Sequence, residues 1–147
     1  MSTNFSLQEL CQSDWADRNG VTNEPDKEAA KNLLLLAEKL EEVRAILGHP
    51  IHINSGYRSP KVNKAIGGSP TSSHQYGLAA DITCKGYGNP KVVCEAIVAS
   101  GIKFDQCILE FYHPSSGGGW VHLGIGKGMR QQVLSINSHG TFAGIRV

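Results

Sequence analysis

The stretch from Pro25 to Leu47 constrains the fold more than any other part of the sequence. Apolar residues recur there at spacings of three and four, which places them on one face of a helix; they are Ala29, Leu33, Leu36, Leu40, Val43 and Leu47. Gly48 follows directly, at a position where glycine commonly ends a helix. The pattern therefore predicts one long helix whose apolar stripe packs on the core of the protein.

Shorter helices and strands are predicted around this long helix. Capping residues and turn signals favour further helices over residues 5–15, 61–66 and 90–100. Apolar and β-branched runs favour strands at residues 51–54, 78–83, 105–112 and 120–125, with short edge strands after residue 127 and loops at 17–24 and 115–119. The predicted fold is a single α+β domain over residues 1–147, a small antiparallel sheet with helices packed on one side.

The charge balance argues against partners that are recognised by bulk charge. Lys and Arg total 14 and Asp and Glu total 13, so neither nucleic acid nor an anionic membrane surface is an expected partner. The longest apolar run, residues 33–37, is too short for membrane insertion. No apolar signal-peptide segment follows Met1, so we expect the chain to be made in the cytoplasm. We also expect it to be a monomer.

His74 and Asp81 are both potential metal ligands, and they lie seven residues apart. Two ligands of one zinc ion lie within ~3.5 Å of each other, whereas seven residues span ~10 Å on a helix and ~23 Å on a strand. The chain must reverse between them, and Gly77 suits a reversal because glycine tolerates a positive φ. On spacing alone, Asp81 is explained equally well as a carboxylate that caps a nearby turn.

His122 and Glu110 each lie in an apolar strand, and each has two explanations. His122 shares a strand face with Trp120 and Gly124, which fits a polar site and also fits a hydrogen-bonded structural histidine. Glu110 is flanked by apolar residues, and an apolar cleft would raise its pKa, as suits a general base. Without the histidines, a solvent-facing glutamate on an amphipathic strand is the preferred explanation for Glu110.

Two segments together resemble a known family. The chain is similar to the M15 family of zinc D-alanyl-D-alanine peptidases in INSGYRSPKVNKAIGGSPTSSHQYGLAADI and, further on, in WVHLGI. The branch that it resembles most occurs in bacteriophage endolysins and related phage lysis or tail proteins. The SxHxxGxAxD pattern carries most of the resemblance, through Ser72, His74, Gly77, Ala79 and Asp81. The resemblance spans residues 5–133 and implies a hedgehog/DD-peptidase-like fold.

The resemblance also implies a catalytic zinc site. By their matching positions, His74, Asp81 and His122 are expected to bind Zn²⁺. Glu110 is expected to act as the general base toward water that the metal activates. His113 forms an E-x-x-H arrangement with Glu110, which in the dipeptidase branch supplies the third ligand, so His113 is the alternative to His122.

Two further positions are expected to contact substrate, and one position departs from the family pattern. Arg58, in the SGYRS segment, is expected to bind a substrate carboxylate or the developing oxyanion. Ser72 is expected to orient substrate near the metal. Many relatives have histidine where Trp120 stands, so any role of that histidine is missing or changed here.

The function implied by the resemblance is hydrolysis of a peptide bond in bacterial peptidoglycan. The chain is then expected to act at the cell wall after release during phage lysis, or as part of a virion. The bond cleaved stays open among the D-Ala–D-Ala terminus, an interpeptide crosslink and the L-Ala–D-Glu bond. The alternatives are a non-catalytic zinc protein that binds peptidoglycan or a protein partner, a structural phage tail protein, and a bacterial D,D-carboxypeptidase.

Overall fold

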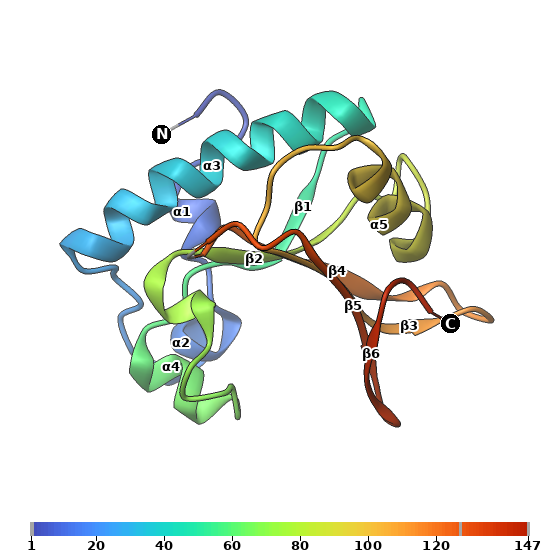
Figure 1. Cartoon of the computed structure of the whole chain (residues 1–147). Coiled ribbons are helices and arrows are strands. Elements are labelled where there is room, and N and C mark those ends of the chain that lie inside the picture. Colours follow the sequence, from blue (N-terminus) through green and yellow to red (C-terminus); the bar gives the residue numbers. More distant parts are fainter. Residues whose placement is uncertain (1, 127, 147) are drawn as a thin grey trace.

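A twisted sheet forms the centre of the structure (Figure 1). The computed structural model describes residues 2–126 and 128–146 of the chain. Among these residues, six strands form one sheet in the order β1-β2-β4-β3-β5-β6. The strands are β1 (His52–Ser55), β2 (Ala79–Thr83), β3 (Gln106–His113), β4 (Gly118–Gly124), β5 (Gln132–Asn137) and β6 (Gly140–Ala143). The predicted α+β class is confirmed.

The strand pairing of the sheet is antiparallel except at one place. β3 pairs with β5 in parallel, and the other four neighbouring pairs are antiparallel. β5 follows β4 in the chain but pairs with β3 on the side away from β4. It runs parallel to β3. The expectation that the tail forms edge strands therefore holds for β6 and is wrong for β5, which has a neighbour on each side.

Each helix begins where a polar side chain caps its first free N–H groups. The helices are α1 (Leu7–Leu10), α2 (Asp14–Asn19), α3 (Lys27–Leu47), α4 (Pro60–Ala65), the 3₁₀ helix η1 (Ser73–Tyr76) and α5 (Pro90–Ala99). Their N-caps are Ser6, Ser13, Asp26, Ser59, Ser72 and Asn89. None of the described helices combines the length and apolar character that crossing a membrane requires.

The predicted helix at residues 5–15 is wrong in extent. Its start is right, because the Ser6 hydroxyl accepts the N–H of Glu9 at 3.1 Å. The helix stops at Leu10, and Ser13 then caps a separate helix, α2, by accepting the N–H of Ala16 at 3.2 Å. The second helix takes up residues 17–19 of the loop expected at residues 17–24.

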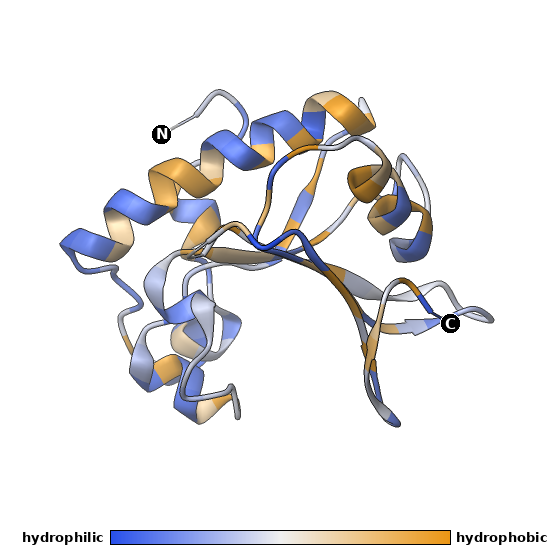
Figure 2. Ribbon diagram, viewed as in Figure 1, coloured by the Kyte–Doolittle hydropathy of each residue, from blue (hydrophilic) through white to orange (hydrophobic). Residues whose placement is uncertain are grey.

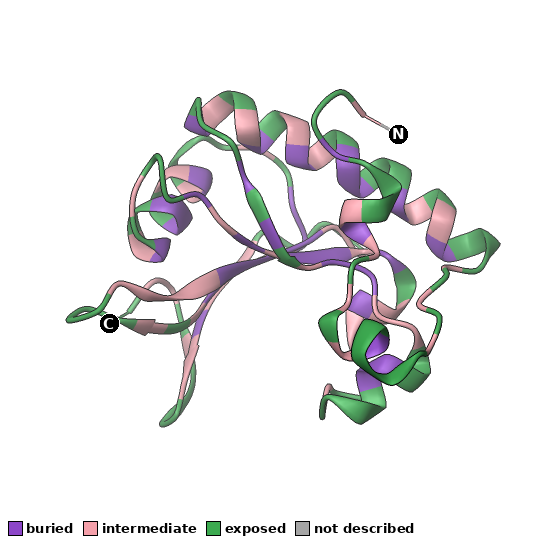
Figure 3. Ribbon diagram, turned by 180° about the vertical axis from the view of Figure 1, so that it is seen from behind, coloured by how far each residue is buried: buried purple, intermediate pink, exposed green. Residues whose placement is uncertain are grey.

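The apolar stripe of α3 packs on one face of the sheet, together with α5. Figure 2 shows hydrophobic and hydrophilic residues alternating along α3, and Figure 3 shows its buried residues on the side toward the sheet. One core joins this stripe to apolar residues of α5 and the central strands. The prediction of helices on one side holds for these two, whereas the short helices α2 and α4 lie beyond the opposite face in Figures 1 and 3.

Alternation along the central strands separates the two faces of the sheet. Ala80 and Ile82 of β2 and Val121 and Leu123 of β4 are fully buried in the core with α3 and α5. The residues between them must point to the other face, which these helices leave uncovered. Asp81 of β2 is one of these, and the functional side chains collect on its face.

We predict that Leu36→Ala lowers the free energy of unfolding by about 2–5 kcal/mol, because it leaves a cavity in the core beneath α3. The neighbouring Leu35 is 56% exposed, so Leu35→Ala removes the same atoms with a change within about 0.5 kcal/mol. Urea denaturation measures both variants. Equal losses of stability would contradict the assigned packing of α3.

Candidate metal centre

Three side chains from three separate elements meet on the face of the sheet that points away from α3 and α5. The Oδ1 atom of Asp81 lies 3.0 Å from Nδ1 of His122 and 3.3 Å from Nε2 of His74. One ligand atom from each of the three residues lies within 4.8 Å of the others, so together they could hold a metal ion. The structure thus brings together the three residues that the sequence proposed as ligands.

The register between β2 and β4 places two of these side chains. Asp81 and His122 are direct partners across the antiparallel pair, and side chains at directly opposed positions point to the same face. His122 is also opposite Ile108 of β3 on its other side. His122 is therefore held between two strands, which leaves its imidazole little freedom to leave the site.

His74 reaches the site from η1, where the chain makes the reversal predicted at Gly77. Gly77 has φ of +72°, a conformation that costs L-residues free energy. A Cβ atom there would lie 2.6 Å from the carbonyl oxygen of Ala29 in α3. Both the backbone angle and the close approach to α3 require glycine, and they place His74 next to β2.

A hydrogen bond on the side away from Asp81 fixes the orientation of the His74 ring. Its Nδ1 lies 2.7 Å from the carbonyl oxygen of Gly56, and because a carbonyl only accepts hydrogen bonds, Nδ1 carries the proton. Burial lowers the pKa of His74, which favours the neutral ring with an unprotonated Nε2 toward Asp81. Hydrogen bonds of this kind orient the histidine ligands of metals.

The Asp81 carboxylate stays ionised in this setting. Burial opposes its charge, but the interactions with the neighbouring His122 and His74 outweigh burial and lower the pKa of Asp81. Nε2 of a neutral His74 and the Asp81 carboxylate are both acceptors, 3.3 Å apart. Such a pair is stable only with a positive charge between them, a proton or a metal ion, so the residues present fit a bound cation.

The predicted base and substrate contacts line the same hollow. This site cavity has a volume of about 410 Å³, and Arg58, Ser72 and Glu110 lie along its wall with the three candidate ligands. Oε1 of Glu110 is 3.7 Å from Nδ1 of His122. Burial and the nearby charge of Asp81 raise the pKa of Glu110. A carboxylate in this state is suited to take up a proton and release it again.

Arg58 is held beside Ser72 at one end of the site cavity. Its Nη2 lies 3.4 Å from the Ser72 hydroxyl. Its Nε is buried with no hydrogen-bond partner in the described part of the chain. Burial lowers the pKa of Arg58, but a guanidinium remains charged. Arg58 thus has hydrogen-bonding capacity that the protein itself does not use.

The lining of the site cavity also includes residues that the sequence analysis missed. Leu134 and Ile136 of β5 line it beside Ile108, because the parallel pairing sets Ile108 opposite Leu134 and Glu110 opposite Ile136. No motif marks these positions, and only the pairing of β5 with β3 reveals them. Trp120 lines the cavity as well, and its buried indole Nε1 has no hydrogen-bond partner among the described residues.

The alternative ligand His113 lies apart from this group. It is exposed at the end of β3, where it pairs with Gly118. The register shifts between Glu110 and His113, and Phe111 adopts φ of +52° there. The irregular backbone breaks the alternation of side chains, so the E-x-x-H spacing does not bring His113 into the cluster.

Residues 3–113 match the peptidase M15 family. The chain belongs to the peptidase M15 family. The predicted resemblance is thereby confirmed at the level of the family. The matched segment includes His74, Asp81, Glu110 and Arg58 but ends before His122, so the case for His122 rests on the geometry of β4.

One curated relative is the zinc D-Ala-D-Ala carboxypeptidase of Streptomyces albus G. It is 39% identical to the chain over 82 residues, which cover 54% of this chain and 31% of that protein. The chain therefore spans less than a third of the length of this member of the family.

We predict that Gly77→Ala weakens both folding and divalent-metal binding, because the new methyl group forces η1 away from Ala29 and moves His74. Gly67 is the matched control, with φ of +79° and nothing within 4 Å of an added Cβ. Gly67→Ala should lower the free energy of unfolding by about 1 kcal/mol from backbone strain alone. Gly77→Ala should cost at least about 1 kcal/mol more.

Urea denaturation and calorimetric titration with Zn²⁺ measure the two glycine variants. Equal effects on stability, or unchanged Zn²⁺ affinity in Gly77→Ala, would contradict the role given to this turn.

Proposed function

We propose that the chain is a zinc peptidase that hydrolyses a peptide bond in bacterial peptidoglycan. The observation that carries the proposal is the convergence of His74, Asp81 and His122 within 4.8 Å of one another. Membership of the peptidase M15 family and a zinc-dependent relative support it.

Zinc is the metal that this set of ligands fits. Two imidazole nitrogens and one carboxylate oxygen are common zinc ligands, and three protein ligands leave a fourth tetrahedral position for water or substrate. Bound zinc supplies Lewis acidity, which lowers the pKa of water and polarises a scissile carbonyl group. His74 would contribute Nε2, since its Nδ1 donates to Gly56, and His122 would contribute Nδ1, the nitrogen nearest Asp81.

Glu110 is proposed as the general base. It lines the site cavity with the three ligands, and its carboxylate approaches His122 to 3.7 Å. In this position Glu110 would accept a proton from the attacking water and pass it to the leaving amine. Its raised pKa, caused by burial and by Asp81, brings the carboxyl nearer to the pH at which both transfers are favourable.

Arg58 and Ser72 are proposed to hold the substrate. Arg58 keeps a fixed charge with several N–H donors, and one of them, Nε, has no partner in the described structure. A substrate carboxylate or the oxyanion of the tetrahedral state would satisfy these donors. Ser72 lies within reach of Nη2 of Arg58 and would steer the guanidinium as well as contact the substrate.

A peptidoglycan substrate and action at the cell wall follow from likeness to relatives. The curated relative is named for D-Ala-D-Ala, the terminus of peptidoglycan stem peptides. The WVHLGI segment resembles the phage-type branch, so we propose a role in phage lysis or in a virion, with the chain reaching the wall after release. Mass spectrometry of fragments released from purified peptidoglycan would identify the bond cleaved.

Removal of the metal is predicted to abolish hydrolysis. Chelation with EDTA should stop release of peptidoglycan fragments, and added Zn²⁺ should restore it. His122→Ala should lose Zn²⁺ binding and activity together, whereas His113→Ala should keep both, because His113 is exposed and lies outside the cluster. Full activity after chelation, or loss of Zn²⁺ binding in His113→Ala, would overturn the assignment.

Glu110→Gln is predicted to lower kcat by at least about 100-fold, the usual scale of general-base catalysis. The amide has the same shape but accepts no proton at neutral pH. Zn²⁺ affinity should be nearly unchanged, since Glu110 is not among the three ligands. Unchanged turnover in this variant would instead favour a zinc protein that only binds the cell wall.

A further inference from the structure

A second hollow lies beside the site cavity, and Arg58 lines both of them. This side cavity has a volume of about 400 Å³. It is bounded by α2, by β1 and by α4, with Arg18, His52, Asn54, Trp15 and Val62 among its lining residues. The two hollows are therefore neighbours that share one guanidinium group.

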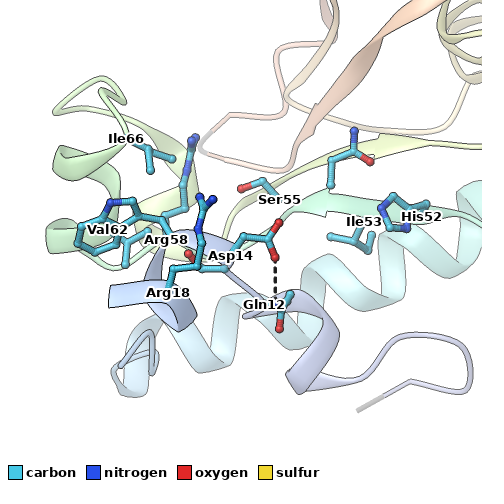
Figure 4. A pocket seen from close by; sticks show the side chains of 12 residues that line it. Gln12, Asp14, Arg18, His52, Ile53, Ser55, Arg58, Val62 and Ile66 are labelled. Atoms are coloured by element: carbon cyan, nitrogen blue, oxygen red, sulfur yellow. Dashed lines mark hydrogen bonds between the residues drawn. The ribbon is translucent and has the colours of Figure 1, made fainter. Parts of the chain in front are cut away.

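Two arginine side chains give the side cavity its chemical character. Figure 4 shows that Arg18 and Arg58 extend their guanidinium groups in the same direction. In the part of the chain that the structure describes, no carboxylate lies within ion-pairing distance of either group. Two unpaired guanidinium groups in one hollow are suited to a carboxylate, which they can hold through charge-assisted hydrogen bonds.

One carboxylate, that of Asp14, is among the residues that line the side cavity. Its Oδ1 accepts a hydrogen bond from the Gln12 amide at 3.3 Å (Figure 4). The same amide also donates to Asp17 at 2.9 Å. These contacts hold Asp14 toward α1 and α2 and leave the arginines available to a ligand.

The lining of the side cavity also includes three aliphatic side chains. Val62 of α4 and Ile53 of β1 are buried, and Ile66 is exposed at the rim. A lining that combines aliphatic side chains with two guanidinium groups suits a ligand that combines aliphatic and carboxylate groups. Stem peptides built from alanine, glutamate and a diamino acid have this composition.

We propose that the side cavity is an extension of the substrate site, in which Arg18 binds a carboxylate of the stem peptide beyond the residue that Arg58 holds. This inference rests on the proposed function, because it takes the site cavity as the place of hydrolysis. Arg18 is then a specificity residue that separates stem peptides with a free carboxylate from their amidated forms.

The test uses one stem pentapeptide, L-Ala-γ-D-Glu-L-Lys-D-Ala-D-Ala, and two analogues. One analogue carries a carboxamide at the glutamate α-position, and the other carries it at the C-terminus. Arg18→Gln should lower kcat/KM for the parent about tenfold, the scale of one hydrogen bond to a charged group, mainly through KM. The effect of Arg18→Gln should disappear for one of the two amides, which identifies the carboxylate that is bound.

Lys31→Gln is the matched control, since it removes one positive charge at an exposed position of α3. Equal losses for all three peptides in Arg18→Gln, or a loss no larger than in Lys31→Gln, would overturn the proposal. Calorimetric binding of the same peptides to the zinc-loaded variants gives a second measure that needs no turnover. If wild type binds the parent through Arg18 but does not hydrolyse it, the proposed function is wrong, whereas the assignment of the side cavity as a binding site for the stem peptide is supported.

Discussion

The antiparallel pairing of β2 with β4 is the constraint on which the rest of this protein depends. It sets Asp81 directly opposite His122, so a carboxylate and an imidazole face each other on one side of the sheet. Their immediate neighbours in the two strands, Ile82 and Val121, point to the other side and join the core. A slip of β4 by one residue against β2 would turn His122 toward that core and Val121 away from it. The same register therefore fixes both the packing of the core and the geometry of the site.

The turn that carries the third candidate ligand, His74, packs against the long helix α3. His74 comes from a short turn outside the sheet, and its position depends on Gly77 passing close to the backbone of Ala29 in α3. Asn32 of α3 also donates to the carbonyl of Tyr76 at 2.8 Å. The helix that forms the core therefore also supports the turn that presents His74, which links the stability of the core to metal binding.

Arg58 belongs to the same framework. The Asn23 side chain donates to the carbonyl of Tyr57 and accepts the N–H of Ser59, which fixes the backbone on both sides of Arg58. The N–H of Arg58 donates to the carbonyl of His74 at 3.0 Å. A peptide bound between the site cavity and the side cavity would therefore meet an arginine whose backbone is held against one of the metal ligands, and substrate position and metal position would be coupled.

The sequence by itself determined the long helix, the α+β class, the glycine reversal and two of the candidate ligands, His74 and Asp81, because periodicity, caps and the SxHxxGxAxD pattern are local signals. It left His122 and His113 as alternative third ligands, since each matches the pattern of a different branch of the family. Only the tertiary structure separated them, through strand register and the irregular backbone after Glu110. The β5 wall and the side cavity depend on contacts between segments far apart in the chain, and no local pattern encodes such contacts.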